Sequence, residues 1–172
     1  MQELGTDRLR LRQWQPQDFD EYAALCADPL VMRYLGGTVL ERADAWRHMA
    51  MLAGHWQLKG FGHWAVELKQ TQAMIGRIGF FEPEGWPGFE LGWTIARAHQ
   101  RQGYASEGAK AALDWAFNHT PQQQVISLIH PENTASKQVA LKLGERFWRN
   151  AVVKGTNVCV YGIERGEHLN LS

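Results

Sequence analysis

The chain consists of segments in which apolar residues alternate every two positions and segments in which they recur at helical spacing. Residues 6–14 place Leu9 and Leu11 on one face and arginines on the other, which predicts a half-buried strand. Residues 41–58 carry an apolar stripe at helical spacing, which predicts a long helix. Residues 105–119 form a second stripe, whose alanines would let a helix approach a sheet closely. The chain therefore combines strands with amphipathic helices.

The other elements follow from the same two periods and from the glycines and prolines at their ends. Helical spacing after Pro16 and after Pro29 predicts two shorter helical segments. A helix over residues 134–143 would end before Gly144, a common residue at that place. Further strands are predicted at residues 62–68, 74–81, 89–96, 125–129, 146–153 and 158–163. Without an internal repeat or linker, the pattern predicts one α+β domain over residues 1–172, with about seven strands.

Composition excludes several classes of function. Eighteen basic residues balance eighteen acidic ones, so we expect neither a nucleic-acid partner nor a membrane. Cys26 and Cys159 lie far apart and form no metal-ligand spacing, so we expect no metal site and no disulfide. No leader-like start and no apolar run of membrane-spanning length is seen, which predicts a cytoplasmic protein.

The turn between the strand at 89–96 and the helix at 105–119 carries the main functional signal. Its sequence is Gln100-Arg101-Gln102-Gly103-Tyr104-Ala105. A basic turn with a glycine before a helix suits a phosphate, because backbone N–H groups converge at the positive end of the helix. A plain surface turn is the alternative. The spacing resembles the pyrophosphate loop of the GNAT N-acetyltransferases, Q/R-x-x-G-x-G/A. Ala105 stands where many members have glycine, so its backbone is expected to be helical.

A second motif lies after the strand at 125–129. Asn133 and Ser136 match the family pattern N-x-x-S, which is followed by a helix and a glycine. The two motifs together cover residues 89–144, and the chain most closely resembles the RimJ/RimL-like branch of the GNAT family. Asn133 is also a good helix N-cap, and capping alone would explain it.

The resemblance implies a fold and a cofactor. It implies a mixed, mainly antiparallel sheet with helices on both faces, in which the strands at 89–96 and 125–129 are parallel and splay apart. It implies acetyl-CoA as acyl donor, with the pyrophosphate on the backbone amides of residues 101–106 and the pantetheine along a bulged strand at 93–95. The expected cofactor-binding residues are Trp93, Thr94, Ile95, Gln100, Arg101, Gln102, Gly103, Tyr104, Ala105, Ser106 and Asn133. The ring of Tyr104 is expected to face solvent or adenine. Dimers are frequent in the family, so a homodimer is compatible with the resemblance.

Acetyl transfer to an amine needs a base, because an alkylammonium must first lose a proton. We expect Glu90, at the start of the strand leading into the loop, to be that base. The alternative is that Glu90 only orients the substrate or forms a salt bridge. Weaker candidates on neighbouring segments are Glu67, Glu82, Glu84 and His63.

The departing thiolate needs a proton. Many GNAT enzymes place a tyrosine seven residues after the asparagine, where this chain has Ala140. The RimJ/RimL-like resemblance instead implies Ser136 as the proton donor, although a serine at that place can also be an ordinary hydroxyl near a helix start.

The chain has eight tryptophans, which is many for its length. Five of them fit the apolar stripes and are expected in the core: Trp46, Trp56, Trp64, Trp93 and Trp115. Trp86 lies in a loop and is expected to line the pocket of the amine acceptor.

The resulting expectation is transfer of an acetyl group from acetyl-CoA to a primary amine, a protein N-terminus or a small molecule, by direct attack in a ternary complex. The absence of an acidic cluster is evidence against a polyamine. The alternative is a catalytically silent CoA-binding GNAT module with a sensing or scaffolding role. A nucleotide- or phosphate-binding protein of another class would not need the Asn133 and Ser136 motif.

Overall fold

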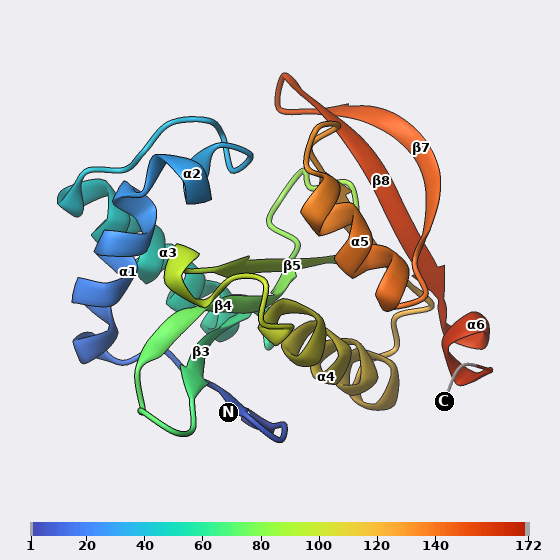
Figure 1. The fold of residues 1–172 in the computed structure, drawn as a ribbon. Helices are drawn as coiled ribbons and strands as arrows, with labels where there is room; N and C mark the ends of the chain where they lie inside the picture. Colours follow the sequence, from blue (N-terminus) through green and yellow to red (C-terminus); the bar gives the residue numbers. More distant parts are fainter. Residues whose placement is uncertain (1, 171–172) are drawn as a thin grey trace.

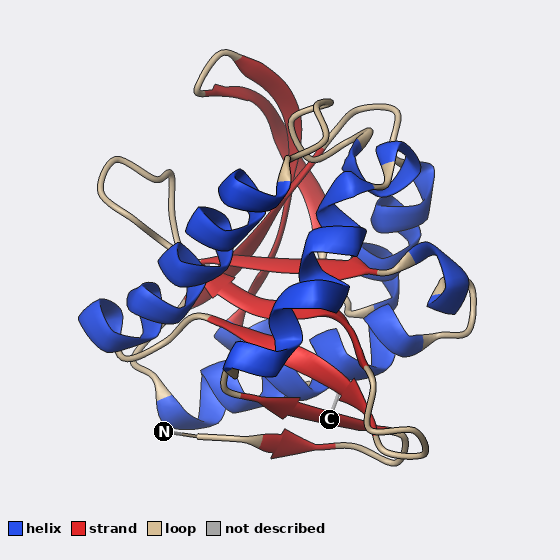
Figure 2. Cartoon of the chain, turned by 90° about the vertical axis from the view of Figure 1, so that its left-hand side faces the viewer, coloured by secondary structure: helices blue, strands red, loops and turns tan. Residues whose placement is uncertain are grey.

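The computed structural model describes residues 2–170 and contains one eight-stranded sheet with helices on both faces (Figures 1 and 2). The strands are β1 (Leu4–Gly5), β2 (Leu9–Arg12), β3 (His63–Leu68), β4 (Met74–Phe81), β5 (Glu90–Ile95), β6 (Gln124–Ile129), β7 (Arg146–Val153) and β8 (Thr156–Glu164). The α-helices are α1 (Phe19–Ala27), α2 (Pro29–Met32), α3 (Arg42–Lys59), α4 (Tyr104–His119), α5 (Thr134–Lys142) and α6 (Arg165–Leu169). Two 3-10 turns, η1 (Pro16–Asp18) and η2 (Arg97–His99), lie before α1 and after β5.

The order of the strands is β1-β2-β3-β4-β5-β6-β8-β7, and all the described pairings are antiparallel except that of β5 with β6. The described residues of β5 and β6 pair at one position, Glu90 opposite Ile126, beyond which the strands diverge. The mixed sheet and the splayed parallel pair are therefore confirmed. β4 and β5, in contrast, pair in continuous register along the whole of β5, so the bulge implied for residues 93–95 is absent from this pairing.

The helices cover the two faces that strand alternation creates. Leu9, Leu11, Trp64 and Ile78 point to one face and are fully buried in the core that α4 covers. Gly108 lets α4 lie close, because a Cβ there would be 2.5 Å from Cδ1 of Ile78. α5 packs over β6 and β8 on the same face, and α1 and α3 pack on the opposite face (Figure 1). Both predicted layers are therefore present.

Three details differ from the predictions. Arg12 was placed on a polar face, yet it is buried and pairs with Asp18 at 2.7 Å and with Glu67 at 2.6 Å. Trp46 was expected in the core but is 56% exposed, because the buried stripe of α3 passes through the neighbouring Ala45. The short elements β1 and α6 were not predicted, so the sheet has one strand more than expected.

Candidate active site

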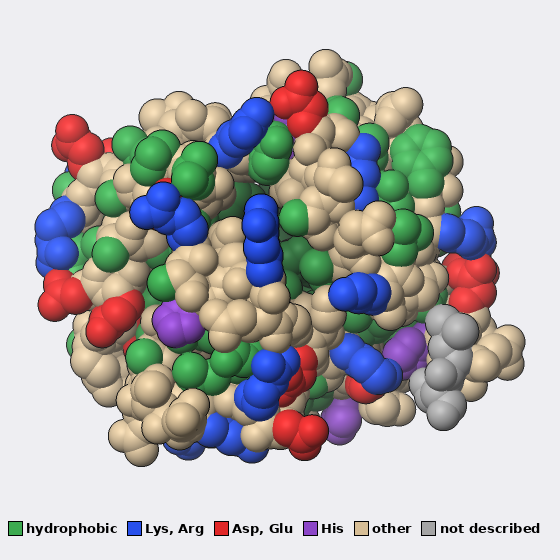
Figure 3. All heavy atoms as spheres, viewed as in Figure 1, with side chains coloured by type: hydrophobic (Ala, Val, Ile, Leu, Met, Phe, Trp, Pro, Cys, Tyr) green, Lys and Arg blue, Asp and Glu red, His purple; other side chains and the backbone are tan. Residues whose placement is uncertain are grey.

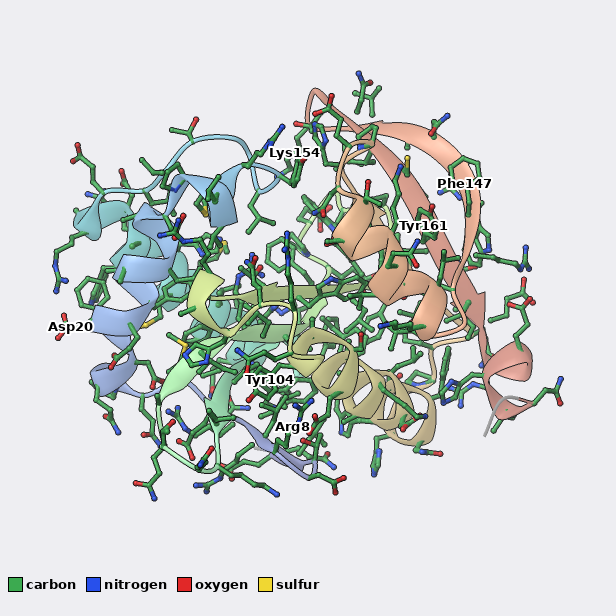
Figure 4. The ribbon with its side chains drawn as sticks, in the orientation of Figure 1. Arg8, Asp20, Tyr104, Phe147, Lys154 and Tyr161 are labelled. Atoms are coloured by element: carbon green, nitrogen blue, oxygen red, sulfur yellow. The ribbon has the colours of Figure 1, made fainter. Side chains whose placement is uncertain are left out.

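A cavity of about 350 Å³, which we call the floor cavity, lies over β4 and β5 on the face that carries α1 and α3. Its walls come from α3, the segment after α2, the loop before β5, and the β7–β8 hairpin, which projects beyond the rest of the sheet (Figure 2). Figure 4 shows Lys154 near the tip of this hairpin, and its Nζ lies 5.5 Å from the ring centroid of Trp86. The charged and polar side chains among the lining residues are His48, His63, Arg77, Glu90, Thr94, Ser127, His130, Asn133, Ser136, Lys154 and Thr156.

The register of the central strands explains the open space. Gly79 of β4 lies opposite Gly92 of β5 and opposite His63 of β3. Residues paired in this way share a face of the sheet, so this row lacks two side chains. The imidazole lies over the gap, because a Cβ added at Gly92 would be 3.1 Å from Cε1 of His63. Gly79 also has a φ of 150°.

The two rows beside these glycines delimit the floor. Arg77 lies opposite Thr94 on one side, and Phe81 lies opposite Glu90 on the other. The rows are separated by four residues of β5, which is about 13 Å at the rise of a strand. A guanidinium and a carboxyl group thus extend from the same face of the sheet at opposite ends of the cavity.

Glu90 supplies the carboxyl group of the floor cavity. Its Oε2 accepts a hydrogen bond of 2.7 Å from Nε1 of Trp86. Burial raises the pKa of Glu90 to about 7, although the hydrogen bond from Trp86, the charge of Arg77 and the amide of Leu128 lower it. A carboxyl group with such a pKa can exchange protons near neutral pH. Of the described residues that line this cavity, Glu90 is the one that carries a carboxyl group.

Arg77 has no carboxylate partner among the described residues. Its Nη1 lies 3.2 Å from Nδ1 of His63. Burial and the nearby charge of Arg77 lower the pKa of His63 well below its usual range. Burial likewise lowers the pKa of His48 to about 4, and its Nδ1 lies 2.7 Å from the hydroxyl of Tyr22. Both histidines are therefore neutral at pH 7, and His63 can accept a hydrogen bond from Arg77.

A second cavity of about 410 Å³, which we call the loop groove, runs past the N-terminal end of α4 and beside α5. Figure 3 shows Lys and Arg side chains around the hollow on this face, and Arg101 and Lys142 line the groove. Among the described residues, the backbone amides of residues 101–106 donate to no protein acceptor. Free amides at the positive end of a helix are suited to bind an anion.

The loop itself is held in a defined shape. Arg101 and Gly103 have positive φ angles of 61° and 84°, which turn the chain twice before α4. The side-chain amide of Gln100 donates to the carbonyl of Ile95 at 2.9 Å, which ties the loop to the end of β5. Gln102 donates to a carbonyl of η2 at 3.2 Å. The glutamine side chains therefore stabilise the loop, and its amides remain available.

α4 begins at Tyr104, so Ala105 is helical, as its replacement of glycine predicted. The Tyr104 ring does not face solvent: the residue is only 9% exposed, and the ring lies 4.4 Å from Cζ of Arg8 (Figure 4), while its contact with adenine stays a prediction. Arg8 also donates to the carbonyl of Gln102 at 2.9 Å and pairs with Glu107 at 2.6 Å. Arg8 thus ties the segment before β2 to the loop, a role that its position on a polar strand face did not reveal.

The floor cavity and the loop groove meet between β5 and α5. Both are lined by Tyr34, Leu35, Trp93, Thr94, Asn133 and Ser136. Oγ1 of Thr94 is buried here without a hydrogen-bond partner, an atom that a bound ligand can satisfy. Oδ1 of Asn133 accepts from the amide of Ser136 at 3.1 Å and so caps α5. Among the described hydrogen bonds, the Asn133 amide group and the Ser136 hydroxyl have no partner, so both remain available at the junction.

The weaker base candidates differ from Glu90 in their surroundings. Glu67 is engaged by Arg12, and Glu82 and Glu84 line neither cavity. His63 does line the floor cavity, where it contacts Arg77. Trp93 is only partly buried and lies at the junction instead of in the closed core, whereas the loop residue Trp86 lines the floor cavity as predicted.

Sequence reasoning missed two groups near the site. Arg77 interrupts the apolar run of β4 between glycines, and that interruption was an available signal. Glu145 is 2% exposed, and its Oε1 lies 2.9 Å from Oγ of Ser127, a residue that lines the floor cavity. No local pattern points to Glu145, because its partner is on another strand.

No group of three or more His, Cys, Asp or Glu side chains in residues 2–170 is arranged to hold a metal ion. Within the same residues, every helix is too short or too polar to cross a bilayer.

Comparison with known proteins identifies the family. Residues 8–146 match the acetyltransferase (GNAT) domain. The uncharacterized N-acetyltransferase YnaD of Bacillus subtilis (strain 168) is 30% identical over 155 residues, which span 88% of this chain and 89% of YnaD. The crystal structure of an acetyltransferase from Agrobacterium tumefaciens str. C58 superposes with a TM-score of 0.86 at 29% identity, with 95% of each chain covered. The structure of the ribosomal L7/L12 α-N-protein acetyltransferase RimL in complex with coenzyme A has the same fold, with a TM-score of 0.78, 16% identity, and 95% and 98% of the two chains covered. This chain therefore belongs to the GNAT family of acetyltransferases.

Proposed function

We propose that this protein is an N-acetyltransferase of the RimJ/RimL-like branch, which transfers the acetyl group of acetyl-CoA to a primary amine by direct attack in a ternary complex. The observation that carries the proposal is the meeting of two cavities at Thr94, Asn133 and Ser136. One cavity has free helix-end amides and basic side chains, and the other has a carboxyl group with a pKa near 7. Donor and acceptor can therefore enter separately and meet at one place.

The loop groove fits coenzyme A. The amides of residues 101–106 would hold the pyrophosphate, with Arg101 supplying a positive charge. Residues 92–95 of β5 have no described hydrogen-bond partner on β6, so their backbone can pair with the amide-containing pantetheine as with another strand. The buried hydroxyl of Thr94 has no hydrogen-bond partner among the described residues and lies where the loop groove meets the floor cavity, so it can contact this arm. Asn133 would donate its amide to the same arm while it caps α5.

Glu90 would act as the base. Its carboxylate faces the floor cavity, from which an amine can reach the junction. Because its pKa is about 7, a large fraction is ionised at neutral pH and can still accept a proton from an ammonium, directly or through water. The backbone amides of residues 93–95 would stabilise the charge that develops on the thioester oxygen. Ser136, whose hydroxyl is unengaged at the junction, would hydrogen-bond or protonate the departing thiolate.

The test is a screen of amino acids, peptides and small amines for release of free coenzyme A from acetyl-CoA. For an amine that is acetylated, Glu90→Gln should lower kcat by about 10²- to 10⁴-fold, the usual contribution of a general base. The glutamine keeps an acceptor for Trp86, so the local geometry is conserved. Glu84→Gln, in the exposed loop before β5 and outside both cavities, is the matched control and should retain full activity.

The rival function is a silent CoA-binding module. It predicts binding of acetyl-CoA by calorimetry without turnover of any amine, and with no effect of Glu90→Gln. An active enzyme whose kcat is unchanged by Glu90→Gln would contradict the assignment of the base and leave transfer itself intact. The single domain, the cytoplasmic location and the homodimer expected from the sequence stay predictions; sedimentation of the purified chain tests the homodimer.

A further inference from the structure

We propose that the acceptor is a small amine that also carries a carboxylate, and that Arg77 binds this carboxylate while the amine lies at Glu90. The proposal rests on the proposed function and deepens it by naming the substrate class, that of amino acids and other short amino-carboxylic acids. Arg77 is then a specificity-determining residue of the floor cavity.

The first argument is the state of the Arg77 guanidinium. The other inward-facing arginine of the sheet, Arg12, is enclosed by the carboxylates of Asp18 and Glu67. Arg77 is partly buried on the neighbouring cavity wall, yet its described hydrogen-bonding partners, the ring of His63 and the hydroxyl of Tyr22, are neutral groups. A guanidinium has five donors in a planar fork that matches a carboxylate, and an unpaired charge away from water is costly. A carboxylate from the substrate would satisfy it.

The second argument is geometry. The Arg77 side chain reaches His63, whose Cα lies opposite Gly79, so the guanidinium extends over the glycine row toward the row of Glu90. Gly79 and Gly92 leave this part of the floor free of side chains. A ligand lying there would meet a cation on one side and a carboxyl group on the other. Only a few bonds need to separate its amine from its carboxylate.

The third argument is the charge of the floor cavity. Its described lining holds two cations, Arg77 and Lys154, and one carboxyl group, Glu90. Of its three histidines, His48 and His63 contribute no positive charge at neutral pH, because their pKa values are lowered. A polyamine would therefore meet more positive than negative charge, whereas an amine with one carboxylate complements the lining. A protein N-terminus is followed by a peptide bond, so its backbone brings no carboxylate next to the amine.

His63 is a positioning residue in this scheme. Its neutral ring accepts from Nη1 of Arg77 and lies against the Cα of Gly92, so it restrains the guanidinium over the floor. Replacement of His63 by glutamine keeps an acceptor and should preserve the selectivity described below. Replacement by leucine should weaken the selectivity without removing the charge.

The experiment uses matched acceptor pairs that share the same amine: each L-amino acid against its amide and its methyl ester. For the wild-type protein with acetyl-CoA we expect kcat/KM for the acid to exceed that for the amide by about 100-fold, the order of magnitude expected when a buried donor is left without its acceptor. Arg77→Gln should remove this preference, mainly by raising KM for the acids. Arg77→Lys should keep part of it, since it keeps the charge and loses the fork. Arg42→Gln, at an exposed ion pair of α3, is the control.

Comparable rates for acids, amides and polyamines in the wild type would overturn the proposal, and so would an acid preference that survives Arg77→Gln. If Arg77→Gln fails to fold, the comparison of acids with amides in the wild-type protein still tests the proposal. Binding provides a separate readout, because Trp86 and Trp93 line the floor cavity and their fluorescence should respond to acids but not to amides. Arg77-dependent binding without turnover would support the carboxylate site and contradict the proposed transfer. If the protein neither bound nor acetylated any acid, the carboxylate site itself would be overturned.

Discussion

Replacing Glu145 by glutamine should stabilise the protein, and the gain should grow as the pH rises. Glu145 follows α5, is 2% exposed, and has one oxygen, Oε2, without any hydrogen-bond partner. Its other oxygen lies 2.9 Å from Oγ of Ser127, which in turn lies 2.9 Å from the carbonyl of Leu91. A serine hydroxyl has one proton to donate. Both contacts are hydrogen bonds only if Ser127 donates to Leu91 and a protonated Glu145 donates to Ser127.

The pKa of Glu145 agrees with this hydrogen-bond arrangement. Burial raises it from 4.5 to about 8, and the charge of Glu90 adds to the rise, whereas a hydrogen bond donated by Ser127 to the ionised carboxylate would lower it. The folded protein therefore holds a proton that the unfolded chain releases. Because the folded pKa is the higher one, the contribution of this group to stability is complete below pH 4.5 and is lost as the pH rises toward 8. With about 1.4 kcal/mol per pKa unit, the loss between pH 5 and pH 7.5 amounts to about 3 kcal/mol.

Glutamine has a similar shape, can donate to Ser127 and does not ionise. The difference in unfolding free energy between Glu145→Gln and wild type should therefore increase by about 3 kcal/mol between pH 5 and pH 7.5. Urea unfolding followed by tryptophan fluorescence at several pH values measures it, with unchanged m-values as the check on two-state behaviour. Glu21→Gln, at an exposed position on α1, is the control. Parallel stability curves for Glu145→Gln and wild type would refute the protonated carboxyl.

Three further predictions concern the site. Because the pKa of Glu90 is raised to about 7, kcat at saturating substrates should fall as the pH drops below 7, and this fall should be absent in Glu90→Gln. Trp86→Phe removes a hydrogen bond that lowers the pKa of Glu90, so the fall in kcat should move to higher pH in a pH–rate profile. Asn133→Ala should cost about 1 kcal/mol of stability through the lost cap and should also raise KM for acetyl-CoA. Asn133→Asp keeps the cap, so it should raise KM alone. Equal effects of the two changes on the melting temperature would contradict the dual role of Asn133. Gly79→Ala should destabilise the protein by about 3 kcal/mol or more, because its Cβ would lie 2.2 Å from the carbonyl oxygen of Gly62; a melting temperature within a few degrees of wild type would show that the strands shift easily.

The elements that form the loop groove were predictable because their signals are local. β5, the loop and α4 are consecutive in the chain, and one stripe of alanines with Gly108 determines how closely α4 packs. The capping contact of Asn133 spans three residues, so it too is visible in the sequence. The errors in this region concern side-chain partners that are remote in sequence. Tyr104 is buried because Arg8, from the other end of the chain, lies over its ring.

Residues whose surroundings depend on pairing between distant segments were harder to predict. Arg12 was placed on a polar face by alternation alone, but the pairing of β2 with β3 brings Glu67 to it, and η1 brings Asp18. Glu145 becomes a buried acid with a raised pKa because segments remote in sequence enclose it, and β6 brings Ser127 to it. Trp46 shows the converse case, in which an apolar residue in a helical stripe meets no partner and stays exposed.

The same contrast, between local contacts and contacts that depend on strand pairing, applies to the proposed sites of the acyl donor and the amine acceptor. The proposed contacts of the donor are largely backbone amides, a strand edge and a helix end, so many side chains can be exchanged around them without loss of the groove. The floor cavity is formed by three strands in one register, which places the gap at Gly79 and Gly92 beside Arg77 and Glu90. A side chain at Gly92, where an added Cβ would meet the His63 ring, or a neutral residue at position 77 should change the acceptor and leave the loop groove unaltered. Selectivity for the amine should therefore be determined by a few floor residues on β3, β4 and β5, and exchanging them is the direct way to change the substrate of this fold.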